Sequence, residues 1–259
     1  MARLNEKQKP ALAIAASRGT VAFLISAAIA ASNASAQSLS PPLPPVRPSS
    51  PSSEAAHPAP GPPAATPTPA LPSEARACLA QLTASGVVAE AVPDPPHPLA
   101  DCGVAAPVRL VSLRLSDGAT LDLPGRPILD CGFAVTFSAF VRDLLAPLGE
   151  ATLGAPVAAL DTGPGYECRG RNQVEGAKTS AHGKGIAIDL VAILFADRRR
   201  VAVGRPANPR EASFVQTIRH AACGWFTTVL GPGSDAAHAD HLHFDVLGHG
   251  ASDDYRICE

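Results

Sequence analysis

The stretch Ser180-Ala-His-Gly-Lys-Gly-Ile-Ala-Ile-Asp189 joins a polar turn to an apolar run that continues to Phe195. The run predicts a buried strand that holds one charged side chain, Asp189. An aspartate in such surroundings needs a cation or a hydrogen-bond donor nearby. The two glycines between His182 and Asp189 give the backbone the freedom to bring both side chains to one site. Alone, the pattern is equally typical of a salt-bridged core aspartate.

A second stretch, His238-Ala-Asp-His-Leu-His-Phe-Asp245, follows about fifty residues later. Side chains alternate along a strand, so His241, His243 and Asp245 share one face and the apolar residues between them face the core. Buried imidazoles and carboxylates must be solvated, paired or metal-bound, because burying them alone is costly. Zinc accepts imidazole nitrogen and carboxylate oxygen, and three protein ligands leave one position for water. The two stretches together therefore predict a hydrolytic metal centre.

The rest of the chain predicts an α+β domain around a small, largely antiparallel sheet flanked by helices. Apolar residues at helical spacing predict helices at 73–85, 132–148 and 211–223, the second ending before Gly149. Strands are expected at 108–115, 186–195 and 241–247. Strands and helices do not alternate regularly along the sequence, so a parallel sheet is not expected.

The amino terminus predicts export. Residues 1–36 combine a basic start, a short apolar run and the cleavage site Ala34-Ser-Ala36, so we expect a signal peptide cleaved after Ala36 and a periplasmic or secreted protein. The run is too short to span a bilayer, although an uncleaved anchor is the alternative. Residues 37–73 are rich in proline and predict a disordered linker. A single domain then occupies 74–259, with no stable membrane span once the signal peptide is removed.

The cysteines and the net charge indicate how the domain is stabilised and which partners are not expected. Six cysteines (Cys78, Cys102, Cys131, Cys168, Cys223, Cys258) without a C-x-x-C pair favour up to three disulfides in an exported chain, or some free thiols. A bridge at Cys258 would hold the carboxyl terminus in place. The formal charge of −2 becomes about −5 once the signal peptide removes four basic groups and one acid. Without a basic stripe, nucleic acid is not an expected partner.

The pattern S-x-H-x-x-G-x-A-x-D followed by H-x-H-x-D resembles the zinc D-alanyl-D-alanine peptidase superfamily, which includes lysostaphin-type endopeptidases and the hedgehog N-terminal domain. Within it, the chain most resembles the bacterial extensin-like C-terminal domain proteins, over most of 76–259. Gly165-Tyr-Glu-Cys-Arg169, residues 222–232 and Tyr255-Arg-Ile-Cys258 also carry this likeness. The resemblance implies a disulfide-stapled fold like that of hedgehog and these peptidases.

The resemblance also implies the ligands of one zinc ion, which are His182, Asp189 and His243. Asp240 and His241 compete for the role of general base. Related peptidases carry an acid three residues before the last histidine, whereas lysostaphin-like members use the first histidine of H-x-H. We favour Asp240 as the base and His241 as a transition-state donor, with the reverse assignment open.

Two further residues match substrate-binding positions. By the resemblance, Arg169 grips a carboxylate or carbonyl oxygen of the substrate, because its guanidinium presents paired donors. The alternative is a structural ion pair. Ser180 matches a serine that hydrogen-bonds near the site, and a simple turn residue is its alternative. Asp245 would orient a histidine ligand, or lie on the surface, and the same two alternatives apply to His238.

These observations predict an exported zinc-dependent hydrolase of peptidoglycan peptides, acting on cross-links or stem peptides as an endopeptidase or a carboxypeptidase. The alternative is a non-enzymatic, cell-wall-associated domain that retains the peptidase fold. A third hypothesis is a purely structural domain whose histidines bind nothing.

Overall fold

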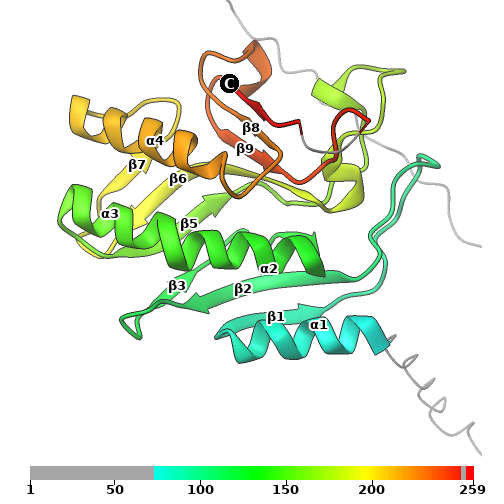
Figure 1. Cartoon of the computed structure of the whole chain (residues 1–259), viewed down its shortest axis with the longest axis horizontal. Coiled ribbons are helices and arrows are strands. Elements are labelled where there is room, and N and C mark those ends of the chain that lie inside the picture. The colour runs from blue at the N-terminus through cyan, green and yellow to red at the C-terminus, as the bar shows by residue number, and fades with distance from the viewer. Residues whose placement is uncertain (1–72, 252–254) are drawn as a thin grey trace, which may run out of the picture. The chain divides into compact units, whose positions relative to one another are not determined.

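The computed structural model describes residues 73–251 and 255–259. The predicted signal peptide at 1–36 and, apart from Ser73, the predicted linker at 37–73 lie outside the described residues. The described part is a domain of helices packed on one mixed sheet (Figure 1).

Four α-helices and several short helical turns interrupt the strands. The α-helices are α1 (Ser73–Ala84), α2 (Cys131–Phe140), α3 (Ala146–Leu153) and α4 (Pro209–Ala222). A π-helical turn, η1 (Val141–Leu145), joins α2 to α3, and 3₁₀ turns form η2 (Arg171–Gln173), η3 (Ala181–Lys184) and η4 (Ala236–His238). The π-turn precedes Pro147, which has no N–H to donate to the helix.

The ten strands form one sheet in the order β1-β2-β3-β5-β6-β9-β8-β10, with β4 paired to β2 and β7 to β6. Their bounds are β1 Val87–Ala91, β2 Pro107–Arg114, β3 Thr120–Asp122, β4 Ile128–Asp130, β5 Val157–Thr162, β6 Ala187–Phe195, β7 Arg200–Ala202, β8 Thr228–Leu230, β9 Leu242–Asp245 and β10 Ile257–Cys258. The β3–β5 and β8–β10 pairs are parallel and the other pairs are antiparallel. The sheet is therefore mixed, and larger than the small sheet that the sequence predicted.

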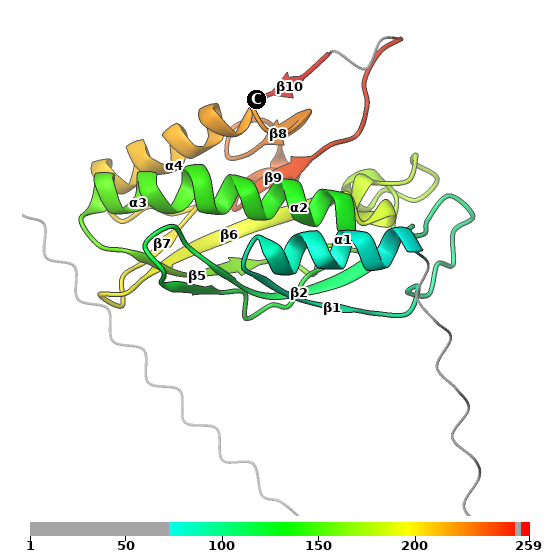
Figure 2. The same ribbon diagram turned by 60° about the horizontal axis from the view of Figure 1, so that its bottom comes forward.

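The helices lie on one face of this sheet, as Figure 2 shows, where α1, α2, α3 and α4 sit together above the strands. The joined helix from Cys131 to Leu153 is long and apolar enough to cross a membrane, but half of its most apolar part is buried. Its apolar side faces the core of the domain, which accounts for its composition without a membrane.

An aromatic cluster fixes the orientation of β9. Phe244 is fully buried and stacks on Phe226 at 4.9 Å between ring centroids, and Phe140 of α2 lies 5.4 Å from it. Because side chains alternate, Phe244 on the helix-covered face forces His243 and Asp245 onto the opposite face. Burying one phenylalanine in this way contributes about 2–3 kcal/mol, so the direction of β9 is strongly determined.

The α+β class and the predicted helices and strands are present, with ends shifted by a few residues. One helix end was wrong, because the helix that we expected to stop before Gly149 continues to Leu153 and ends at Gly154 with φ of 77°. Gly149 serves close packing instead, since a Cβ there would meet Val157 at 2.8 Å.

All six cysteines form disulfides, which confirms the expected stapling. The pairs are Cys78–Cys131, Cys102–Cys168 and Cys223–Cys258. The last pair ties β10 to the end of α4, as expected for the carboxyl terminus. The second pair joins two loops that lie beside the site described next.

Candidate metal centre

Two of the predicted ligands face each other across neighbouring strands. β6 and β9 are antiparallel, and their register places Asp189 directly opposite His243. Residues in this relation have Cβ atoms about 5 Å apart, within reach of a shared ion. The flanking apolar residues Ile188 and Phe244 are also paired and fully buried, so the two polar side chains project together from the other face.

His182 reaches the same point from η3, the turn that precedes β6. Ser180 begins this turn, and its Oγ accepts a hydrogen bond from the His182 N–H at 3.4 Å. Gly185 ends the turn with φ of 66°, a conformation that favours glycine. The turn that the sequence predicted between His182 and Asp189 is therefore present.

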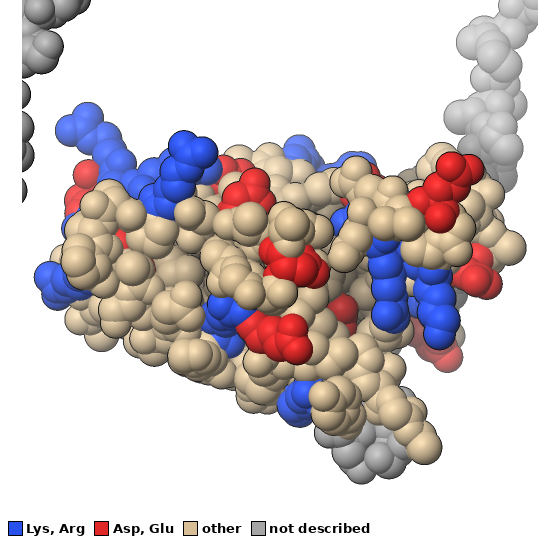
Figure 3. All heavy atoms as spheres, turned by 90° about the horizontal axis from the view of Figure 1, so that it is seen from above, with Lys and Arg blue, Asp and Glu red and all other residues tan. Residues whose placement is uncertain are grey.

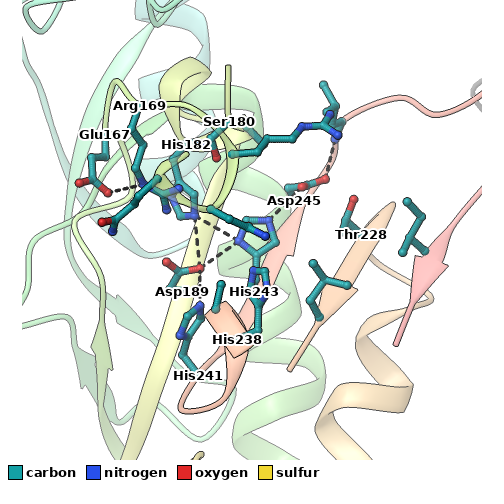
Figure 4. A pocket seen from close by; sticks show the side chains of 18 of the residues that line it. Glu167, Arg169, Ser180, His182, Asp189, Thr228, His238, His241, His243 and Asp245 are labelled. Atoms are coloured by element: carbon teal, nitrogen blue, oxygen red, sulfur yellow. Dashed lines mark hydrogen bonds and ion pairs between the residues drawn. The ribbon is translucent and has the colours of Figure 1, made fainter. Parts of the chain in front are cut away.

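The three ligating atoms converge. His182 Nε2 lies 3.1 Å from His243 Nδ1, and Asp189 Oδ1 lies 2.9 Å from His243 Nδ1 and 3.3 Å from His182 Nε2. In a tetrahedral zinc site, bonds of about 2.0–2.1 Å place neighbouring ligand atoms about 3.3 Å apart. The observed separations are close to this spacing (Figure 4).

The outer nitrogen of each imidazole is bound to an acceptor. His182 Nδ1 donates to the carbonyl oxygen of Gly165 at 2.7 Å, and His243 Nε2 donates to Asp245 Oδ2 at 2.9 Å. Each inner nitrogen then presents a lone pair, and these face the Asp189 carboxylate. Three electron-rich atoms this close require a proton or a cation between them. Because metal-ligating histidines have such outer partners, the donor set fits a zinc ion.

The same contacts shift the pKa values of the cluster. Burial opposes the charged form of His243, but the hydrogen bonds that its ring donates to Asp189 and Asp245 raise its pKa to about 9. Burial likewise disfavours the charged form of Asp189, yet the hydrogen bonds that it accepts from His182 and His243 hold its pKa well below its ordinary value. Without an ion, a proton on His243 therefore occupies the centre of the cluster at neutral pH.

The cluster lies at the base of a cavity of about 500 Å³ (Figure 4). Its walls come from β6, β8, β9, β10 and the loops around η2 and η4. This volume lies within the range of pockets that hold small ligands, about 300–1,000 Å³.

The two candidates for general base occupy different positions. His241 Nε2 lies 3.5 Å from Asp189 Oδ1, and the His241 side chain is 17% exposed. Asp240 is 84% exposed, and its carboxylate accepts a hydrogen bond from His241 Nδ1 at 2.9 Å. Both residues precede β9, which begins at Leu242. The geometry thus favours His241 over Asp240, the reverse of our preference from the sequence.

Both predicted substrate-binding residues line the cavity. Arg169 donates from Nε to Glu167 at 2.7 Å, so the ion pair considered as its alternative role is present. Its guanidinium nevertheless remains in the cavity wall, partly exposed. Ser180 is buried and both lines the cavity and caps η3, so its two alternative roles coincide.

Other polar residues of the cavity were not assigned from the sequence. His238, left open between two roles, is 8% exposed and binds Asp235 through Nδ1 at 2.7 Å. Burial lowers its pKa more than Asp235 raises it. His249 contacts Thr228 Oγ1 through Nε2 at 2.7 Å. No pattern pointed to this pair, because β8 is too short to be recognised and its partners are distant in sequence.

The Cys102–Cys168 disulfide supports the His182 turn. A Cβ at Gly183 would lie 2.9 Å from Cys102 Sγ, so the disulfide packs directly on the turn. For the zinc site that the sequence predicts, replacing both cysteines by serine is expected to weaken zinc binding by about 10- to 100-fold, as loss of supporting contacts does at other metal sites. Competition with a chromophoric chelator measures this. Serine at Cys78 and Cys131 is the control, which should lower the melting temperature but leave zinc affinity within about threefold.

Protonation of His243 should govern the stability of the metal-free chain. Its pKa is higher when folded, about 9, than the ordinary value of 6.5, so the proton stabilises the fold fully below pH 6.5. We expect about 3 kcal/mol of unfolding free energy to be lost as the pH rises through 9. Urea unfolding with chelator at several pH values, compared with His243→Gln, measures this. A wild-type profile parallel to that of the variant would contradict it.

A comparison of the chain with known protein families finds one that matches most of it. Residues 76–259 match the family described as extensin-like protein C-terminus. No curated protein and no solved structure matches the chain. The matched range contains the disulfides, the cavity and all three candidate ligands.

Proposed function

The chain belongs to the extensin-like protein C-terminus family, and from this premise we propose that it is an exported, zinc-dependent hydrolase of peptidoglycan peptides. It would act on cross-links as an endopeptidase or on stem peptides as a carboxypeptidase. The proposal includes a relation to the zinc D-alanyl-D-alanine peptidases and the hedgehog domain, which the spacing of the two motifs supports.

One observation carries the proposal. The ligating atoms of His182, Asp189 and His243 lie 2.9–3.3 Å apart at the base of a cavity. Both imidazoles have their outer nitrogens bound, which leaves the inner lone pairs for a cation. Three protein ligands leave a coordination position for water, as a catalytic rather than a structural zinc site does.

A bound zinc ion would supply a water of lowered pKa and polarise the scissile carbonyl. His241 Nε2, beside Asp189, would serve as the general base that takes a proton from water and gives it to the leaving amine. Asp240 is a positioning residue, because its carboxylate binds His241 Nδ1–H and keeps the lone pair on Nε2. Arg169 in the cavity wall binds a substrate oxygen with the guanidinium nitrogens that Glu167 does not occupy.

Peptidoglycan as the substrate rests on the resemblance of the motifs and on the predicted export signal. The proline-rich segment at 37–73 would extend the domain from its point of export. Periplasmic or secreted location and zinc as the metal are parts of the same proposal.

The test is digestion of purified sacculi by the purified mature chain, with and without chelator, followed by separation of the muropeptides. We expect loss of cross-linked dimers or of terminal D-alanine, abolished by chelator and restored by zinc. Unchanged muropeptides with a zinc-loaded chain would instead support the non-enzymatic, cell-wall-associated domain.

A further inference from the structure

A second cavity of about 460 Å³ adjoins the candidate metal centre. It shares four lining residues with the main cavity, namely Arg171, Ser180, Ala181 and Leu247. Ser180 is two residues from the candidate ligand His182. The two cavities are therefore direct neighbours on the same segment of chain.

The second cavity has an excess of positive charge. Arg171, Lys178 and Lys184 line it, against a single acid, Asp101. Among the described residues, no acid lies within 4.0 Å of the ammonium group of Lys178 or Lys184. Both lysine side chains are exposed, so water screens their mutual repulsion, and together they give this cavity a local attraction for an anion.

Lysine is rare in this chain, so the presence of two lysines at one cavity is informative. The chain has lysine only at Lys7, Lys9, Lys178 and Lys184, and its other strong bases are arginines. Two of these four lie in the predicted signal peptide, and the other two line this cavity. Lys184 belongs to η3, whose preceding residues Ala181, His182 and Gly183 are buried. The ammonium group is therefore attached to the same rigid turn as a candidate metal ligand.

Figure 3 shows one face of the molecule, seen from above, on which basic and acidic side chains are interspersed without a long basic stripe. A polyanion such as nucleic acid needs a continuous basic track. The local charge suits one or two small anionic groups.

We propose that the second cavity is an anion subsite that binds a free carboxylate of the peptide substrate, close to the scissile bond. This inference rests on the proposed function, because it names a chemical feature of the same substrate. Lys178 and Lys184 provide the charge, Arg171 lies between the two cavities, and Asp101 limits the affinity. The subsite would select acidic peptides over their amidated forms.

The test compares two synthetic stem peptides that differ only in one side carboxyl group, free in one and a carboxamide in the other. Calorimetry measures their dissociation constants for the chelated wild-type chain and for the zinc-loaded His241→Ala chain, in which hydrolysis is slow. We expect the acidic peptide to bind about tenfold more tightly in both, since each exposed ion pair contributes modestly. The preference should fade from about 50 to 500 mM salt.

Matched variants show which side chains cause the tighter binding of the acidic peptide. Lys178→Gln with Lys184→Gln should abolish it, whereas Asp101→Asn should increase it by about two- to threefold. Arg114→Gln with Arg210→Gln removes the same charge from exposed positions outside both cavities and should leave it unchanged.

The outcomes separate this inference from the proposed function. Preference for the acidic peptide without cleavage by the zinc-loaded wild-type chain would uphold the subsite and overturn the hydrolase. Cleavage of both peptides without preference, or a preference that survives loss of both lysines, would overturn the subsite alone. If neither peptide binds, both are overturned.

Discussion

Replacing His243 by alanine is expected to abolish zinc binding and to reduce hydrolysis of muropeptides by at least about 10³-fold. His243 lies between Asp189 and Asp245, at 2.9 Å from an oxygen of each. The change removes one ligand and also leaves two buried carboxylates without their shared partner. Zinc per chain, measured by elemental analysis after dialysis, should fall below about 0.2 ion.

The loss of buried partners can also destabilise the fold, by about 3–5 kcal/mol for a broken buried ion pair. Asp189→Asn therefore provides a second variant of nearly unchanged shape, which should lose zinc while keeping the wild-type circular dichroism spectrum. His220→Ala, at an exposed position of α4, is the control and should retain zinc and activity. Full activity in folded Asp189→Asn would refute the ligand assignment.

Replacing His241 by alanine is expected to lower kcat by about 10²- to 10⁴-fold, the usual contribution of a general base, with zinc content unchanged. This result follows from the position of His241 Nε2, 3.5 Å from Asp189 Oδ1, and from its hydrogen bond to Asp240. Asp240→Asn should cost only about tenfold, because Asp240 acts through the orientation of His241.

Steady-state kinetics and pH profiles of both variants measure which substitution lowers kcat more. The His241→Ala profile should lose the acidic limb that reports the base, whereas Asp240→Asn should shift that limb. A larger loss in Asp240→Asn than in His241→Ala would restore Asp240 as the base, which was the preference from the sequence.

Local sequence patterns predicted the parts of the site that lie within one element. Alternation along residues 241–245 placed His243 and Asp245 on one face, and the glycines after His182 predicted its turn. The sequence could not give the strand register that places Asp189 opposite His243, because pairing between segments 54 residues apart depends on the whole sheet. The resemblance favoured Asp240 as the base, whereas strand alternation placed His241 on the ligand face, and in the structure His241 rather than Asp240 lines the cavity.

The parts of the fold that were missed are short or depend on distant partners. β3, β4, β7 and β8 have three residues each and carry too little pattern to be recognised. β1 and β5, of five and six residues, were also missed, because their apolar residues do not alternate regularly with polar ones. β10 has two residues and pairs in parallel with β8, and the Cys223–Cys258 disulfide beside this pairing was not readable from the spacing of the cysteines. Gly149 resembles a helix end in the sequence, but the close packing of α3 on Val157 of β5 is what requires a glycine there.

The most direct measurement is a calorimetric titration of the chelated wild-type chain with zinc, repeated in two buffers of different ionisation enthalpy. Convergence of His182, Asp189 and His243 predicts one ion per chain, bound with submicromolar affinity, and release of about one proton near pH 7.5 as the ion replaces the proton on His243. The absence of saturable binding, or binding that survives unchanged in Asp189→Asn, would contradict the account.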